Sequence, residues 1–120
     1  METEELREQI RETKMLIEEG KIGKKGLRKK ASELIDTVEN SPKRDLVKIC
    51  NAGECKGLLV YENDNKDSGL MISPKSIYEG GLRNSVPHGK GNETCCNDLS
   101  YLGEYRNGSP LLIVRINKKE

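Results

Sequence analysis

Four cysteines and one histidine are the residues of this chain best suited to hold a metal. Cys50 and Cys55 are separated by four residues, whereas Cys95 and Cys96 are adjacent. Structural zinc takes four Cys or His ligands in a tetrahedron, but adjacent residues of a strand point to opposite faces, so Cys95 and Cys96 make a poor pair. The spacing therefore favours buried structural thiols over a zinc site formed by Cys50, Cys55, His88 and Cys95. A disulfide or redox role is a third alternative.

His88 could also act in phosphodiester cleavage by general acid–base catalysis, because Arg83 and Lys90 lie near it in the sequence. The chain has one histidine, so no histidine pair can form. The glycines around His88 also lack the spacing of a phosphate-binding loop. We therefore expect no catalytic residue, no cofactor and no enzymatic activity.

A cluster of basic residues could bind the phosphates of a lipid surface or of a nucleic acid. The alternative is a solvated helix start that the acidic residues before it neutralise. Basic side chains at a helix N-terminus oppose the macrodipole, which hints at a use for them. The basic cluster consists of Lys21, Lys24, Lys25, Arg28, Lys29 and Lys30.

Residues 101–108 repeat the first half of residues 78–91, at an offset of 23 residues (from 78 to 101). A fixed short period is the signature of a repeat architecture. Because glycine weakens a strand, a repeated glycine suggests close approach of the backbone, with an aromatic ring of a neighbouring unit in the vacant space. The matched positions are Tyr78 and Tyr101, Gly80 and Gly103, and Arg83 and Arg106.

The turn of each unit is predicted by its sequence. Asn107-Gly108 lies between two strand-like segments, and Asn-Gly is the strongest short-range hairpin signal because both central residues of a type I′ turn need positive φ. Asn84-Ser85 occupies the same place in the first unit. An isolated hairpin is marginal in water, so the repeat predicts hairpins stacked into one extended sheet.

With these residues the chain resembles a MORN repeat, whose pattern reads roughly Y-x-G-x-W/Y/L-x-N-G-x-x-H-G-x-G. The resemblance covers residues 78–108, and a decayed unit is indicated near residues 46–57, before an insertion near residues 63–74. Beyond Pro110 the match stops at an apolar run that would form a terminal strand. The matching residues are Tyr78, Gly80, Leu82, Asn84, His88, Gly89 and Gly91, then Tyr101, Gly103, Tyr105, Asn107 and Gly108.

The resemblance implies a non-catalytic module that docks partner proteins, helps assembly or associates with membranes. We expect the partner-binding face to be the row of Tyr78, Leu82, Tyr101 and Tyr105, because tyrosine combines apolar area with a polar handle. The alternative is that these side chains stack on each other or on the N-terminal helices.

Composition points to a thin core. Hydrophobic residues make up 33% of the 120 residues and charged residues 34%, with neither Phe nor Trp. The formal net charge of +1 gives no general attraction to nucleic acid or membrane. No apolar run is long enough to span a bilayer, and none follows Met1 as a secretory signal would. We therefore expect a cytoplasmic protein with reduced cysteines.

Hydrophobic periodicity divides the chain into a helical part and a strand part. Residues 1–41 are expected to form a helical hairpin, with helices over about 4–19 and 24 or 27–38, with Thr3 as N-cap and Gly20 as the stop signal. Residues 42–120 are expected to form the MORN-like β-repeat region, with earlier strands at 46–49, 58–61 and 70–72. The predicted fold class is α+β: an N-terminal helical hairpin followed by a small, mostly antiparallel MORN-like β-hairpin repeat sheet.

The small apolar stripes of the two helices predict that the helical hairpin packs on the sheet or on another chain. The open end of the sheet near residues 111–116 is a pairing hazard, so we predict a homodimer through that edge or through the helices. As function we expect a non-enzymatic protein-interaction or scaffold module that uses the MORN-like repeat surface and binds a protein partner. One alternative is a peripheral binder of anionic lipid through the basic cluster of residues 21–30. The other is a small zinc-binding protein that contacts nucleic acid.

Overall fold

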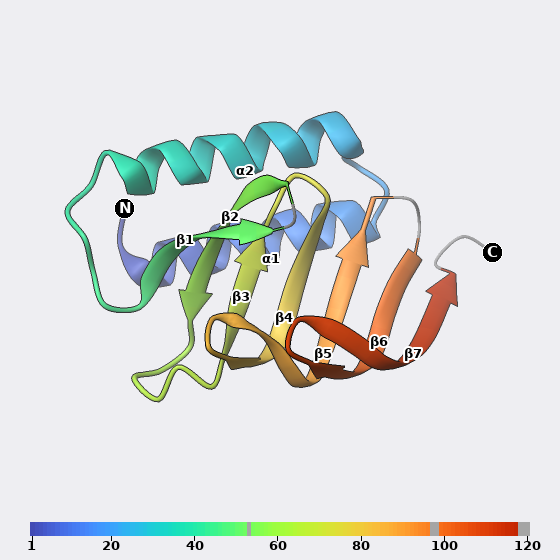
Figure 1. Ribbon diagram of the computed structural model, residues 1–120. Helices are drawn as coiled ribbons and strands as arrows, with labels where there is room; N and C mark the ends of the chain where they lie inside the picture. The colour runs from blue at the N-terminus through green and yellow to red at the C-terminus, as the bar shows by residue number, and fades with distance from the viewer. Residues whose placement is uncertain (53, 97–98, 118–120) are drawn as a thin grey trace.

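Two helices are followed by seven strands that form one antiparallel sheet in sequential order (Figure 1). The computed structural model describes residues 1–52, 54–96 and 99–117. The predicted α+β class is confirmed. The elements are α1 (Thr3–Glu18), α2 (Lys24–Glu39), β1 (Val47–Ala52), β2 (Cys55–Tyr61), β3 (Ser68–Ile72), β4 (Ser76–Arg83), β5 (Val86–Cys95), β6 (Leu99–Arg106) and β7 (Ser109–Asn117).

The ends of α1 follow partly from its sequence. Gly20 has a φ of +72°, a left-handed conformation that glycine adopts without strain. The N–H groups of Gly20 and Lys21 donate to the carbonyls of Ile17 (3.0 Å) and Leu16 (2.9 Å), the two bonds of a Schellman motif. The prediction that Thr3 caps the N-terminus is wrong: Thr3 is already helical, and the N-cap residue is Glu2, which makes no side-chain capping bond.

Both helices lie on the same face of the sheet (Figure 1), where α1 packs on β2, β3 and β5 and α2 packs on β1 and β2. The helical hairpin thus packs on the sheet of its own chain. The shared core is aliphatic, and its burial provides the main stabilisation of the fold. Its members are Leu6, Ile10, Ile17, Leu27, Ala31, Leu34, Ile35, Val47, Leu58, Val60, Leu70, Ile72 and Ile77.

Polar contacts fix how α1 sits on the sheet. Arg7 is buried, although its charge suggests the solvent face, because its guanidinium donates to the carbonyl of Tyr61 at the end of β2 (Nε 3.1 Å, Nη2 2.5 Å). Lys14 Nζ lies 3.0 Å from the carboxylate of Glu79 on β4. These bonds satisfy polar groups that the packing would otherwise leave unpaired.

The two predicted hairpin turns are confirmed. Asn84 and Ser85 have φ angles of 53° and 68°, and Asn107 and Gly108 have 52° and 89°, as type I′ turns require. The first turn joins β4 to β5 and the second joins β6 to β7. Both hairpins carry a register irregularity, between Gly80 and Leu82 and between Glu104 and Tyr105, where the second strand of the hairpin holds the extra residues. β7 forms one edge of the open sheet, and a dimer through it stays a prediction.

Candidate functional site

Four glycines form a row across four neighbouring strands. Gly69 pairs with Gly80, Gly80 with Gly91, and Gly91 with Gly103. Antiparallel partners share a face of the sheet, so the row leaves a furrow without side chains on one face. This face is the one that the helices leave uncovered, because it is shared with Leu59 and Tyr61 of β2, whereas Leu58 and Val60 lie in the helix-facing core.

Tyr78 packs into this furrow. A Cβ atom placed at Gly91 would overlap the Tyr78 ring, and one placed at Gly69 would lie 3.1 Å from Leu82. The Tyr78 hydroxyl donates a 2.7 Å hydrogen bond to the carbonyl of Gly81. Because the glycines lack side chains, they leave the space that the large side chains of β4 occupy.

Tyr105 completes a second, aromatic cluster. Its ring meets that of Tyr78 edge to face, with centroids 5.1 Å apart and planes at 80°, a favoured aromatic geometry. Of the predicted partner-binding row, Tyr78, Leu82 and Tyr105 are 3%, 4% and 4% exposed, and Tyr101 is half-buried. The rings of Tyr78 and Tyr105 thus stack on each other, on the side of the sheet away from the helices.

A hollow of about 370 Å³ opens on this face, a volume within the usual range for ligand pockets. We call it the tyrosine groove. Tyr78 and Tyr105 contribute to its wall, and Glu93 of β5 contributes a carboxylate. The complete lining is Asn51, Met71, Ser73, Lys75, Ser76, Tyr78, Ser85, Val86, Pro87, Glu93, Tyr105, Gly108 and Pro110.

The polar groups that line the tyrosine groove differ in how well they are hydrogen-bonded. The Ser76 hydroxyl donates a 2.6 Å hydrogen bond to Glu93. The Tyr105 hydroxyl is buried and makes no hydrogen bond of ordinary geometry within the described part of the chain. Burial raises the pKa of Tyr105 to about 12, helped by the charge of Glu93 and a loose hydrogen bond to it. Burial and Glu93 likewise raise the pKa of Cys95 to about 11.

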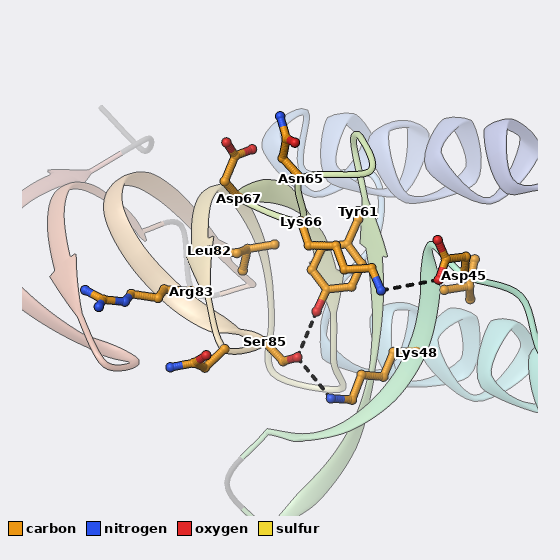
Figure 2. Close-up of a pocket in the computed structure, with 11 residues that line it drawn as sticks. Asp45, Lys48, Tyr61, Asn65, Lys66, Asp67, Leu82, Arg83 and Ser85 are labelled. Carbon is orange, nitrogen blue, oxygen red and sulfur yellow. Dashed lines mark hydrogen bonds and ion pairs between the residues drawn. The ribbon is translucent and has the colours of Figure 1, made fainter.

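A second hollow, of about 580 Å³, lies beside the β4–β5 turn (Figure 2). The hydroxyls of Tyr61 and Ser85 are 2.8 Å apart, and Lys48 Nζ donates to Ser85 at 3.0 Å. Lys66 Nζ lies 3.4 Å from Asp45 and 5.7 Å from the centre of the Tyr61 ring. These contacts tie the turn to β1 and β2 and tie the loop after β2 to the residues before β1. Because the polar groups bond to one another, we interpret this hollow as a structural polar cluster, the polar clasp, and not as a ligand site.

The structure does not bring the candidate zinc ligands together. All four cysteines are free thiols, and within residues 1–52, 54–96 and 99–117 no three His, Cys, Asp or Glu side chains form a group that could hold a metal. Cys95 shares the uncovered face with Glu93, whereas Cys96 packs against the helix-facing core. The adjacent cysteines thus serve opposite sides of the sheet, as the alternation of a strand predicts.

The residues considered for acid–base catalysis are also apart from any common site. His88 is half-buried, and its Nδ1 atom makes no hydrogen bond within the described residues. Lys90 and Arg83 are exposed, and Arg83 points away from the polar clasp in Figure 2. The His88 carbonyl oxygen leaves no room for a side chain at Gly81, so the backbone of this residue has a packing role.

The basic cluster lies at the start of α2, on the helix side of the sheet. Lys24, Lys25, Arg28 and Lys29 are exposed, and within the described residues none of them makes an ion pair. Gly23 is the N-cap residue and offers no side-chain bond, and the first turn has no acidic residue. Lys21 pairs with Glu19 at 3.3 Å.

Sequence reasoning missed Glu93, Ser76 and Met71, because none belongs to the repeat pattern. A signal was nevertheless present: Glu93 follows Gly91 by two positions, so on a strand it must share the face of that glycine. The register then places Glu93 between Tyr78 and Tyr101 on the flanking strands.

Comparisons of the chain with protein-family models, with curated proteins and with solved structures gave no match. Over the described residues, no helix is long and apolar enough to cross a membrane.

Proposed function

We propose that this chain is a non-enzymatic protein-interaction module, similar to MORN-repeat proteins, that docks an extended segment of a partner in the tyrosine groove. The observation that carries the proposal is the hollow of about 370 Å³ on the sheet face that the helices leave uncovered. Tyrosine side chains are enriched at interfaces because they offer apolar area together with a hydrogen-bonding group.

The repeated hairpins support a docking role. The turns at Asn84-Ser85 and Asn107-Gly108 have the same handedness, and residues from both turns line the groove. A surface built from equivalent hairpins is extended and suits a partner that lies along it.

The thiol of Cys95, which lies near Tyr105 but is not among the residues that line the groove, also favours binding over catalysis. The thiolate is the nucleophilic form of cysteine, and the pKa of Cys95 is raised to about 11. Near neutral pH this thiol stays protonated. The tyrosine beside it, Tyr105, stays protonated for the same reason, since its pKa is about 12.

The proposal can be tested by selecting peptides from a random display library on the immobilised full chain. Pro110 is exposed and lines the groove, so Pro110→Trp should obstruct it. Met15 is 57% exposed on α1, on the other side of the sheet, and Met15→Trp adds the same side chain there as a matched control. We expect Pro110→Trp to weaken the selected peptides by roughly tenfold or more, about 1.4 kcal/mol, and Met15→Trp to leave them unchanged.

Two results would contradict a docking role for this groove. One is a selection that enriches no peptide. The other is a set of peptides that bind Pro110→Trp as well as the parent chain. Circular dichroism of each variant would show that the fold is retained.

A second candidate function rests on the basic cluster, which is exposed and faces an uncapped helix start. We infer that it could attract an anionic membrane surface, where each basic residue contributes about 1 kcal/mol. Sedimentation with neutral and anionic vesicles tests this, using Lys24→Gln/Lys25→Gln against the equally charged control Lys43→Gln/Lys75→Gln. Binding to anionic vesicles that falls with salt and only with the first pair would support it. Equal loss with both pairs, or no sedimentation, would exclude it.

A further inference from the structure

Glu93 lies in the tyrosine groove among aromatic neighbours. It pairs in register with Tyr78 on one side and with Tyr101 on the other, and its side chain is half-buried. Within the described residues its hydrogen-bond partner of ordinary geometry is the neutral hydroxyl of Ser76, and no ion pair to it is found there. A carboxylate that loses part of its hydration gains most from a positively charged partner.

The negative charge of Glu93 shifts the pKa of three side chains around the groove. It raises the pKa of Tyr78, of Tyr105 and of Cys95, in each case in addition to the effect of burial. A field that opposes the appearance of negative charge on three neighbouring groups favours the entry of a cation.

The groove walls suit a cation in a second way. The Tyr78 and Tyr105 rings meet edge to face, and both line the hollow. A cation over a tyrosine ring is attracted by the ring quadrupole. The same molecule contains such a contact, with Lys66 Nζ 5.7 Å from the centre of the Tyr61 ring.

The Tyr105 hydroxyl provides the remaining feature of a built site. The side chain is 4% exposed, and its hydroxyl has no ordinary hydrogen bond among the described residues. A buried hydroxyl with only a loose hydrogen bond, here to Glu93, is poorly satisfied, and a donor entering the groove would give it a better partner. Lys75 also lines the groove, but it is exposed on the turn after β3 and is not paired with Glu93.

We propose that the tyrosine groove receives the cationic end of a lysine or arginine side chain from a partner segment, with Glu93 as its counter-ion. This inference rests on the proposed function and names the partner's chemistry. The guanidinium or ammonium group binds the Glu93 carboxylate, its N–H groups donate to the Tyr105 hydroxyl, and the aliphatic stem lies between Met71 and the tyrosine rings.

The test is a titration of the isotope-labelled full chain, followed by amide NMR shifts. The probes are N-acetyl-arginine amide, N-acetyl-lysine amide and N-acetyl-citrulline amide, the last being a neutral analogue of arginine. We expect the two cationic probes to shift the amides of Tyr78, Glu93 and Tyr105, and the citrulline probe to bind at least about tenfold more weakly. Which cationic probe binds more tightly decides between arginine and lysine.

Glu93→Gln removes the charge while keeping an oxygen that can accept the Ser76 bond, and we expect it to reduce binding of the cationic probes by at least about tenfold. Glu104→Gln is the matched control, because Glu104 is exposed on the next strand and its loss should change nothing. Equal binding of the citrulline probe, or full binding by Glu93→Gln, would overturn the inference.

The two proposals can fail separately. If display peptides without lysine or arginine bind the parent chain and lose affinity in Pro110→Trp, the docking function stands and the cation inference falls. If the cationic amides shift the groove residues but no display peptide is enriched, the cation site stands and the docking function falls.

Discussion

The two faces of the sheet are closed by different means. On one face Leu58, Leu70 and Ile77 are completely buried beneath the helices, which complete an aliphatic core. On the other face no helix is present among the described residues; Tyr78 packs over the row of glycines, and Tyr105 packs against the Tyr78 ring. Beneath the helices the first face is closed by this core, whereas the second face keeps a hollow with a carboxylate in it.

This difference shows how a chain of few aromatic residues can pack the two faces of one sheet in different ways. Aliphatic packing under helices supplies stability, because it removes apolar area from water. Tyrosine packing on glycine supplies a shaped surface, because each ring keeps one polar end that needs a partner. Under the proposed docking function, stability and recognition would lie on opposite faces of the same strands.

The largest effect should come from the helix-covered face. Leu70→Ala removes a side chain that is completely buried, and such a change lowers the free energy of unfolding by about 2–5 kcal/mol. Leu102 is the matched control, since register places it in the same row of the same face but it is 49% exposed. Leu102→Ala should change stability by less than about 0.5 kcal/mol. Urea denaturation would measure the free energy of unfolding of both variants. Similar losses of stability would mean that cover by the helices does not distinguish Leu70 from Leu102.

On the uncovered face, Gly91→Ala should destabilise the fold by roughly 1–3 kcal/mol, the usual effect of overpacking. The new methyl group would overlap the Tyr78 ring, whose atoms are the nearest neighbours of that position. The smaller side chain of Tyr78→Leu should relieve the overlap, so Gly91→Ala should have less effect in that background. Strictly additive losses in the double-mutant cycle would show that the glycine is required for another reason.

A smaller contrast separates the two tyrosines. Tyr78→Phe leaves the Gly81 carbonyl without its 2.7 Å hydrogen bond and should lower the free energy of unfolding by about 1–2 kcal/mol. Tyr105→Phe removes a hydroxyl that has no ordinary hydrogen bond, so its stability should be unchanged or slightly higher. Denaturant midpoints of the two variants would measure this. A larger loss for Tyr105→Phe would mean that its hydroxyl is satisfied in solution.

The smallest contrast appears in alkaline solution. The pKa of Tyr105 is raised from 10.0 to about 12, so between these values the unfolded chain releases a proton that the folded chain retains. The free energy of unfolding therefore keeps the full contribution of this group below pH 10 and loses it as the pH rises through about 12. Tyr105→Phe has no hydroxyl to ionise at this position, so its free energy of unfolding should fall less steeply with rising pH than that of the parent chain. Parallel pH profiles of variant and parent would contradict the assignment.

Local features of the fold could be predicted from the sequence because they depend on neighbouring residues. Asn107-Gly108 predicts its turn, since positive φ is a property of those residues. Gly20 predicts the end of α1 in the same way. The burial of Arg7 could not be predicted, because the carbonyl that it binds belongs to Tyr61, far along the chain.

The candidate site was only half predictable. The repeat singled out Tyr78 and Tyr105, but it did not show that they pack on each other, nor that Glu93 lies beside them. Those contacts depend on the strand register and on the irregularities after Gly80 and Glu104, which move later residues relative to their partners.

The sequence by itself determined the helices, the hairpin turns and the spacing of the glycines, because periodicity and backbone preference act over a few residues. Tertiary structure alone decided which face the helices cover and which face keeps the groove. The physical reason is that a strand offers two faces, and the choice between them depends on apolar area contributed by distant segments. The aliphatic side chains of β2, β3 and β4 bind the helices on one face of the sheet. The tyrosines therefore pack on the opposite face, which the helices leave uncovered.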